Sequence, residues 1–384
     1  MIYLDNNATT PVDPRVLEVM LPYFTEVYGN AASNDHEMGV TAKRAVDKAR
    51  DQIASLINAK PDEILFTSGA TESDNIALFG VADRYAKKGD HIITCVTEHK
   101  AVLDCCQRLE KMGKRVTYLP VDQYQYGMVD PDAVRQAITP QTILISIMAA
   151  NNEIGTIAPI AEIGKIAREH EVIFHTDATQ AVGHIPIDVK AMHIDLLSMS
   201  AHKCYGPKGV GALYRGSSPR VRLEPVIYGG GHEKGVRSGT LNVPGIVGLG
   251  EALHIAKKEM GKEHDRFWAW TEQMFAQFES ELGNVQRNGH PTQRLPHNLN
   301  VSFVGVESRG LIVKLKDVAI ATGSACTSAK TEPSHVIQAL GFGDERAHTA
   351  IRVSVGRFNT EDELEQGIDK IIDAVRQLQA IRVA

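Results

Sequence analysis

Short apolar runs alternate with amphipathic stretches along much of the chain. Apolar, β-branched runs rich in Val, Ile and Leu predict strands, and positions with a spacing of three to four residues predict helices over 72–87 and 101–112. Strands separated by helices are typical of a mainly parallel sheet with helices on both faces, so the pattern predicts an α/β fold. The predicted strands are 63–67, 91–94, 115–119, 142–147, 172–176, 195–200 and 212–214.

The second part of the chain has a different pattern. A helical stretch over 245–262 contains few turn signals and is expected to bridge to a C-terminal portion, which ends in a helix over 361–379. With 384 residues, the chain is long enough for two domains in one subunit.

The composition of the chain argues against several classes of function. The net charge is -6 and the basic residues are scattered, which argues against direct binding of nucleic acid. No apolar run approaches the ~20 residues of a membrane span, and the first five residues show no leader, so we expect no membrane association and a cytoplasmic location. The five cysteines lack zinc-like spacing and are expected to be free thiols, with Cys95, Cys105 and Cys106 in the core.

Two residues suggest the chemistry of pyridoxal phosphate (PLP). This cofactor needs a lysine amine for its Schiff base and a carboxylate that keeps its ring nitrogen protonated. Asp177 follows the predicted strand 172–176, at the sheet edge where α/β proteins bind ligands, and Lys203 lies just beyond the strand 195–200. Each residue alone is more typical of a helix cap or a surface lysine, but the nearby Gln180, Ser200 and His202 favour a PLP site.

The turn over 68–73 is a candidate phosphate site. Small residues between a strand and a helix let backbone N–H groups approach an anion, and the helix dipole adds roughly half a positive charge there. Ala70 and Thr71 are therefore expected to contact the cofactor phosphate. Without Asp177 and Lys203, the same run is equally typical of an ordinary helix start.

These segments, with others along nearly the whole chain, resemble the cysteine desulfurases, a branch of the class V aminotransferase family with PLP fold type I. The resemblance implies a large PLP-binding domain over 15–250 with a mainly parallel seven-stranded sheet. It also implies a smaller α/β domain formed by 1–14 and 251–384. The matching segments are 3–11, 66–73, 98–99, 150–155, 175–180, 200–211, 237–242, 323–327 and 351–357.

The resemblance also assigns roles to individual residues. His99 is expected to stack on the PLP ring and to move protons, and Gln180 to bond the phenolic oxygen. Arg352 is expected to grip the substrate carboxylate, a task that suits a planar guanidinium. Asn152 would contact both the substrate and the cofactor. The residues assigned to the cofactor phosphate are Ala70, Thr71, Ser200, His202 and, from the other subunit of a homodimer, Thr240.

Cys326 separates this chain from ordinary aminotransferases. It lies in a run of small residues over 321–329 that predicts a loop, where a thiolate is a reachable nucleophile. The resemblance implies that Cys326 takes sulfur from L-cysteine as a persulfide, which leaves L-alanine, with Lys203 and His99 as the other catalytic residues. The sulfur would pass to an iron–sulfur scaffold or another acceptor protein, for cluster assembly or tRNA thiolation. No metal site is expected.

Two kinds of alternative stay open. A selenocysteine lyase or another class V aminotransferase would use the same Lys203 and Asp177 without needing Cys326. A catalytically silent assembly partner could have the same fold, but the intact Lys203, Asp177, His99 and Cys326 argue against silence.

Overall fold

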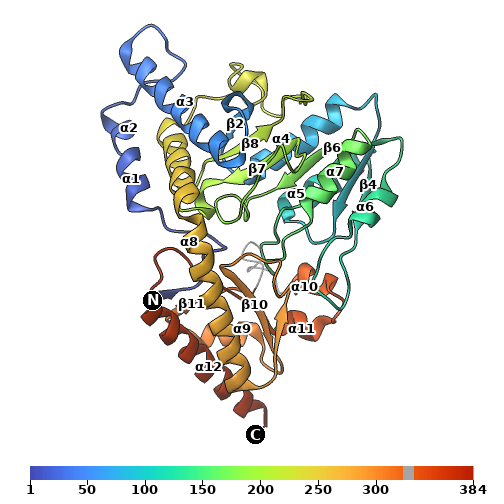
Figure 1. Cartoon of the computed structure of the whole chain (residues 1–384), viewed down its shortest axis with the longest axis vertical. Coiled ribbons are helices and arrows are strands. Elements are labelled where there is room, and N and C mark those ends of the chain that lie inside the picture. The colour runs from blue at the N-terminus through green and yellow to red at the C-terminus, as the bar shows by residue number, and fades with distance from the viewer. Residues whose placement is uncertain (323–332, 384) are drawn as a thin grey trace.

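A computed structural model describes residues 1–322 and 333–383 of the chain (Figure 1). Its largest sheet has seven strands in the order β2-β8-β7-β6-β5-β3-β4. Six of these strands point the same way, and β8 runs antiparallel to both of its neighbours, β2 and β7. The predicted α/β class with a mainly parallel seven-stranded sheet is confirmed. The strands are β2 (Ile64–Thr67), β3 (His91–Cys95), β4 (Arg115–Leu119), β5 (Thr142–Ser146), β6 (Ile173–Asp177), β7 (Leu196–Ser200) and β8 (Gly211–Arg215).

Helices cover both faces of this sheet. Neighbouring strand residues point to opposite faces, so that Ile64 and Phe66 of β2 join one core cluster and Leu65 joins another. The first cluster includes α3 (Glu37–Ile57), α6 (Pro131–Ala137), α7 (Ile160–Glu169) and the start of α8. The second includes α4 (Ala70–Arg84) and α5 (Lys100–Lys111). Both faces of the strands are thus buried, as the continuous apolar runs predict, except in the edge strand β4.

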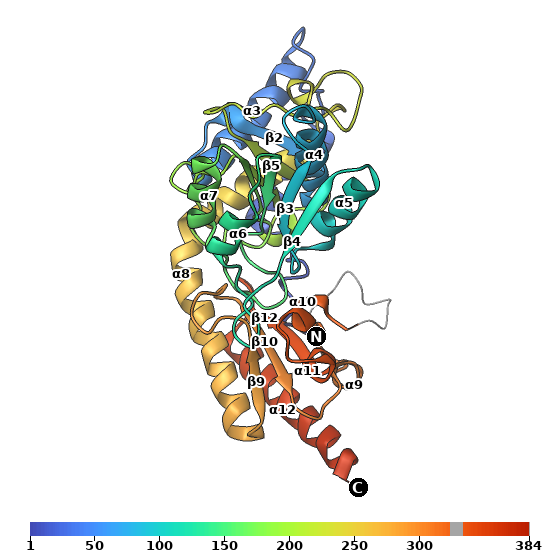
Figure 2. The same cartoon turned by 90° about the vertical axis from the view of Figure 1, so that its right-hand side faces the viewer.

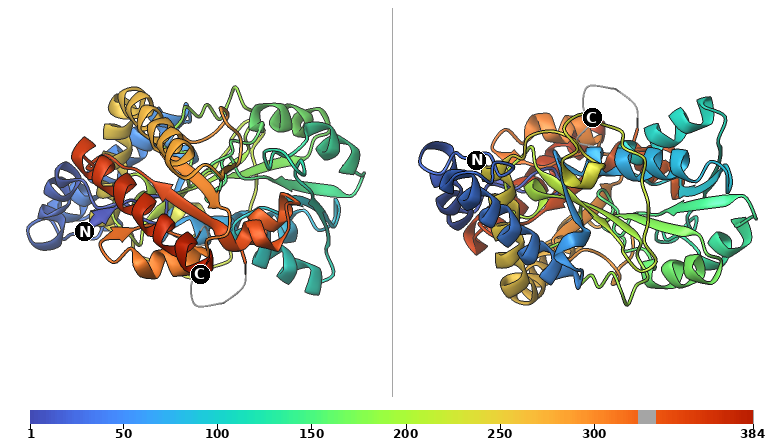
Figure 3. Two further views of the ribbon diagram at one scale, coloured as in Figure 1. Left: turned by 90° about the horizontal axis from the view of Figure 1, so that it is seen from below. Right: turned by 90° about the horizontal axis from the view of Figure 1, so that it is seen from above.

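The remaining elements form a smaller part around a three-stranded antiparallel sheet in the order β12-β10-β9. Residues from the two ends of the chain meet there, because β1 (Ile2–Tyr3) pairs in parallel with β11 (Val318–Ala319). The other elements are β9 (Val285–Asn288), β10 (Asn298–Phe303), α9 (Ser308–Lys314), α10 (His335–Ala339), α11 (Asp344–Thr349), β12 (Ala350–Ser354) and α12 (Glu361–Val383). Figure 3 shows α12 at this end of the molecule.

One helix, α8 (Val243–Leu282), connects the two parts (Figure 2). Its first half packs in the core of the large sheet through residues such as Leu253, and its second half packs in the core of the small part through Phe267 and Phe278. The helix predicted over 245–262 is too short, because the observed helix continues to Leu282. A glycine inside a helix, such as Gly261, destabilises the helix by about 1 kcal/mol relative to alanine. Burial of the aromatic side chains that follow it offsets this cost.

Two short helices, α1 (Pro14–Met20) and α2 (Pro22–Thr25), precede α3. The predicted division of the chain into 15–250 and 1–14 with 251–384 stays a prediction, although the shift of α8 from one core to the other falls between Ile255 and Phe267.

Candidate active site

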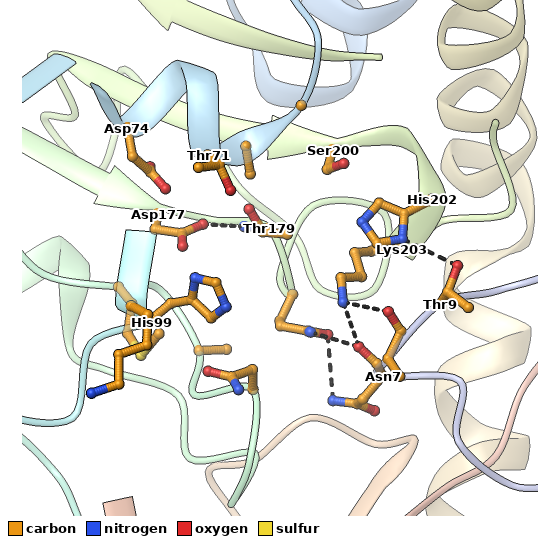
Figure 4. Close-up of a pocket in the computed structure, with 18 of the residues that line it drawn as sticks. Asn7, Thr9, Thr71, Asp74, His99, Asp177, Thr179, Ser200, His202 and Lys203 are labelled. Atoms are coloured by element: carbon orange, nitrogen blue, oxygen red, sulfur yellow. Dashed lines mark hydrogen bonds between the residues drawn. The ribbon is translucent and has the colours of Figure 1, made fainter. Parts of the chain in front are cut away.

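A cavity of about 520 Å³ lies at the carboxyl ends of the parallel strands (Figure 4). This is the edge at which open α/β sheets bind ligands, and the volume is typical of a small-molecule site. Segments far apart in the sequence supply its walls. Among the lining residues are Asn7, Ala8, Ser68, Gly69, Ala70, Thr71, Glu72, Asp74, His99, Asn152, Asp177, Gln180, Ser200, His202, Lys203, Lys208, His335 and Arg352.

Lys203 reaches the cavity from a short 3-10 turn, Ala201–Lys203, that follows β7. Its Nζ donates to the backbone oxygens of Asn7 and Ala8, each at 2.7 Å. Asn7 is also linked to Gln180, whose Nε2 donates to the Asn7 oxygen at 3.0 Å. The N-terminal segment therefore holds the amine at the cavity wall, next to the group expected to bond the phenolic oxygen of PLP.

Asp177 is the last residue of β6, and its side chain is buried at the cavity floor. Its Oδ1 accepts a hydrogen bond from the backbone N–H of Thr179 at 3.0 Å. Figure 4 shows Asp177 beside Asp74 of α4 and across the cavity from Lys203. A carboxylate and an amine on opposite sides of one pocket fit the ring nitrogen and the aldehyde end of PLP.

A buried polar cluster lies behind Asp177. Asp74 is fully buried, and neither of its carboxyl oxygens has a hydrogen-bond partner among the described residues. Burial, followed by the neighbouring Asp177, raises the pKa of Asp74 well above its ordinary value, which favours its neutral form.

His175 completes this cluster from the middle of β6. Its Nε2 lies 3.6 Å from Asp74 Oδ1, and its ring nitrogens bond the hydroxyls of Ser146 at 2.8 Å and Ser198 at 3.0 Å. Burial lowers the pKa of His175 to about 4, so the imidazole is neutral at physiological pH. His175 therefore adds no charge beside Asp177, and burial disfavours a charge on Asp74 as well.

His99 lies where β3 leads into α5. It is the N-cap of that helix, and its Nδ1 accepts from the backbone N–H of Ala101 at 3.2 Å. This bond fixes the ring at the cavity wall, and Figure 4 shows it facing the space between Asp177 and Lys203. The preceding Glu98 is buried and accepts from the Met148 N–H at 2.7 Å; burial raises its pKa well above the ordinary value.

The start of α4 is open to an anion. Its N-cap is Gly69, with a φ of +154° that favours glycine, and no side chain caps the helix there. The first residues of the helix, Ala70 and Thr71, line the cavity, and a helix start without a side-chain cap suits a phosphate. Across the cavity, His202 Nδ1 lies 3.1 Å from Thr9 Oγ1, and burial lowers the pKa of His202 to about 4.

Arg352, in the middle of β12, enters the cavity from the small part. Its side chain is buried, and Nη1 donates to the Asn152 oxygen at 2.7 Å while Nη2 donates to Asp5 Oδ1 at 2.9 Å. These bonds hold the guanidinium plane in one orientation. By contrast, Arg357 lies in a buried ion-pair cluster with Asp13 and Glu263.

The structure thus brings nearly all predicted site residues to one cavity. Thr240 is exposed and does not line it, and Cys326 lies outside the described residues, so their roles stay predictions. Three other lining residues, Asn7, Asp74 and Glu72, were not predicted as site residues. Asn7 and Glu72 lie in segments that carry the family resemblance, which is the signal that points to them, whereas Asp74 stands among the polar residues 71–75 and no sequence signal marks it.

The comparisons with known proteins agree with this geometry. The model of the aminotransferase class-V family matches residues 2–366. The chain therefore belongs to this family of PLP-dependent enzymes. The uncapped start of α4, the amine of Lys203 and the carboxylate of Asp177 are the groups that such a cofactor requires.

Individual relatives define the branch. The chain is 54% identical to a cysteine desulfurase IscS of Anaeromyxobacter dehalogenans over 98% of this chain and 93% of the relative. It is 53% identical to that of Vibrio campbellii, with 98% and 93% covered. The similarity makes the chain a member of the cysteine desulfurases.

Solved structures give the same result. A NifS-like protein superposes with a TM-score of 0.91 at 37% identity, over 98% of this chain and 99% of that one. The structure titled SspA in complex with cysteine has a TM-score of 0.82 at 38% identity, with 94% of this chain and 100% of that one covered.

Among the described residues, no helix is long and apolar enough to span a membrane.

Proposed function

We propose that this chain is a PLP-dependent cysteine desulfurase that removes sulfur from L-cysteine, releases L-alanine and carries the sulfur as a persulfide on Cys326. One observation carries the proposal. A single cavity holds a lysine amine, a buried carboxylate, an uncapped helix start and a buried guanidinium, namely Lys203, Asp177, Ala70–Thr71 and Arg352. The membership of the family and the cysteine-bound relative support the same substrate.

PLP supplies an electron sink when it is bound to the substrate amine. The residues of the chain bind and orient the cofactor. The start of α4 with Ser200 and His202 binds the phosphate, and Asp177 holds a proton on the ring nitrogen. Burial keeps His202 neutral, so it serves as a hydrogen-bonding group there and adds no charge.

Lys203 has two tasks in this proposal. It holds the cofactor before the substrate arrives, and once displaced it moves the α-proton of L-cysteine. The backbone oxygens of Asn7 and Ala8 lie at 2.7 Å from Nζ and orient the amine for both tasks. His99 covers the ring face and relays protons.

Sulfur transfer requires a thiolate that can reach the substrate. Its attack forms an S–S bond as the carbon–sulfur bond breaks, and the electron pair stays on the carbon skeleton, which is protonated to L-alanine. The cysteines within the described residues, Cys95, Cys105, Cys106 and Cys204, are all buried. Burial raises the pKa of Cys95, Cys105 and Cys204 to about 12, which makes them poor nucleophiles at neutral pH. Cys326 is therefore the proposed acceptor.

The name IscS of the relatives supports a role in supplying sulfur for iron–sulfur cluster assembly through an acceptor protein, here proposed for this chain. The homodimer, the reach of Thr240 across it, tRNA thiolation and the cytoplasmic location stay predictions.

The proposal is tested by measuring the alanine and the sulfur that the purified holoprotein releases from L-cysteine. We expect equal amounts of alanine and transferable sulfur, and a visible absorption band that changes when L-cysteine is added. Transamination of alanine without sulfur release would favour an aminotransferase. Activity confined to selenocysteine would favour a lyase, and no cofactor band at all would favour a silent partner.

A further inference from the structure

The glycine-rich segment 229–239 is fastened to the rest of its own chain by two largely buried ion pairs, besides the exposed pair of Lys234 with Asp62. Arg50 pairs with Glu233, whose carboxylate also accepts from the backbone N–H of Phe66 in β2 at 2.8 Å. Arg237 pairs with Glu72 of α4. A segment with so many glycines needs such contacts to keep one shape, and here the same subunit provides them.

The second ion pair reaches the candidate phosphate site. Glu72 is the third residue of α4, and it lines the cavity with Ala70 and Thr71. Its Oε1 accepts from Arg237 Nε at 2.7 Å, and its Oε2 accepts from the Ser68 N–H at 2.7 Å. One carboxylate therefore joins the turn before α4 to the segment that ends just before Thr240.

A carboxylate is an unexpected group in an anion site. Burial alone disfavours its charge, but hydrogen bonds from Arg237 and Ser68 hold the pKa of Glu72 below its ordinary value, so it is ionised. An ionised carboxylate in the same helical turn as a phosphate repels it, unless a cation neutralises the carboxylate. Arg237 is that cation, and the side chains of the pair are only 20% and 12% exposed, where screening by solvent is weak.

We propose that Arg237 is a positioning residue for the cofactor phosphate: it neutralises Glu72, so that this carboxylate can shape the 68–70 turn without repelling the phosphate. The same ion pair aligns the segment before Thr240 with that turn. The inference rests on the proposed function, because it requires PLP in this cavity.

Pyridoxal, which lacks the phosphate, gives a direct test. The affinities of the full-length apoprotein for PLP and for pyridoxal are measured by equilibrium dialysis. Arg237→Gln leaves Glu72 ionised without its partner, so PLP binding should weaken about tenfold or more. Pyridoxal binding should change by less than about twofold, since the repelled group is missing.

A second variant distinguishes charge repulsion by Glu72 from a loss of packing around Arg237. In Arg237→Gln with Glu72→Gln, both charges are gone and an amide still faces Ser68. We expect PLP affinity to return to within about threefold of the parent, which a mere loss of packing would not allow. Arg84→Gln is the matched control. Arg84 pairs with Glu224 at 3.0 Å at the other end of α4, and its loss should leave both affinities unchanged.

The outcomes are distinct. A parent protein that binds neither PLP nor pyridoxal would overturn the proposed function itself. A parent that prefers PLP, together with Arg237→Gln weakening both ligands equally, would leave the proposed function standing and reduce Arg237 to a structural residue. A double variant no better than Arg237→Gln would show that repulsion by Glu72 is not the cause.

Discussion

Arg352 offers a sharp test of substrate binding, and lysine is the informative replacement. The guanidinium is 1% exposed and donates to Asp5 and Asn152. Alanine would leave the Asp5 carboxylate without its partner and damage the fold, which confounds the result. Lysine keeps the positive charge for Asp5 but loses the planar fork that grips a carboxylate at two points.

The magnitude follows from the number of hydrogen bonds. Each bond to a charged group contributes about 1.5 to 3 kcal/mol, and Arg352→Lys loses one of two. At 1.4 kcal/mol for each factor of ten, kcat/KM for L-cysteine should fall about 10- to 100-fold. The visible band of the resting holoprotein should remain, because Arg352 belongs to the substrate side of the cavity.

Alanine release at several L-cysteine concentrations measures this ratio. The matched control is Arg346→Lys, since Arg346 is half-buried and makes two hydrogen bonds, to Asn288 at 2.6 Å and to the Arg287 oxygen at 2.7 Å, but does not line the cavity. Its kcat/KM should equal that of the parent. If Arg352→Lys also kept the parental kcat/KM, the carboxylate clamp would lie elsewhere, and Arg357, paired with Glu263 and Asp13, is not placed to replace it.

Three further predictions concern other groups. Borohydride reduction of the holoprotein should attach the cofactor to Lys203 in peptide maps, and a label on Lys208, which also lines the cavity, would refute the assignment. Cys326→Ala should keep the spectral response to L-cysteine but lose nearly all alanine and persulfide; release at the parental rate would make Cys326 incidental. Because burial raises the pKa of Asp74 in the folded state, stability is lost as pH rises above the ordinary carboxyl pKa and up to the raised one. The thermal midpoint of apo Asp74→Asn should therefore exceed the parental one increasingly as pH rises above about 4, and a constant difference would contradict a raised pKa of Asp74.

The sequence predicts those site residues best that lie at the ends of strands in the large sheet. Asp177 and Lys203 lie at the ends of neighbouring strands with clear apolar patterns, and parallel strands end at one edge, so their meeting was expected. The turn before α4 was expected for the same reason. Apolar periodicity also gave each strand of the large sheet to within a residue or two.

Other features depend on contacts that no local pattern encodes. The bonds of Lys203 to Asn7 and Ala8 join residues almost 200 positions apart, and the pair Arg352–Asp5 spans still more of the chain. The burial of Asp74 depends on how α4 lies over β6. The antiparallel direction of β8 and the continuation of α8 beyond 262 likewise arise from tertiary packing that overrides local signals.

The pairing of the first residues with the last third of the chain has a consequence for biosynthesis. β1 finds its partner β11 only after residue 319 has been made, and Asn6 and Asn7 are bonded by Ser354. Such distant contacts form late, because closing the long loop between them must precede any gain. During synthesis, Gln180 and His202 can hold the segment around Asn7 first, whereas β1 and Asn6 stay without these partners until residues 318–354 have been made. We expect the wall of the cavity formed by the first residues to become rigid only when residues 318–354 have folded onto it.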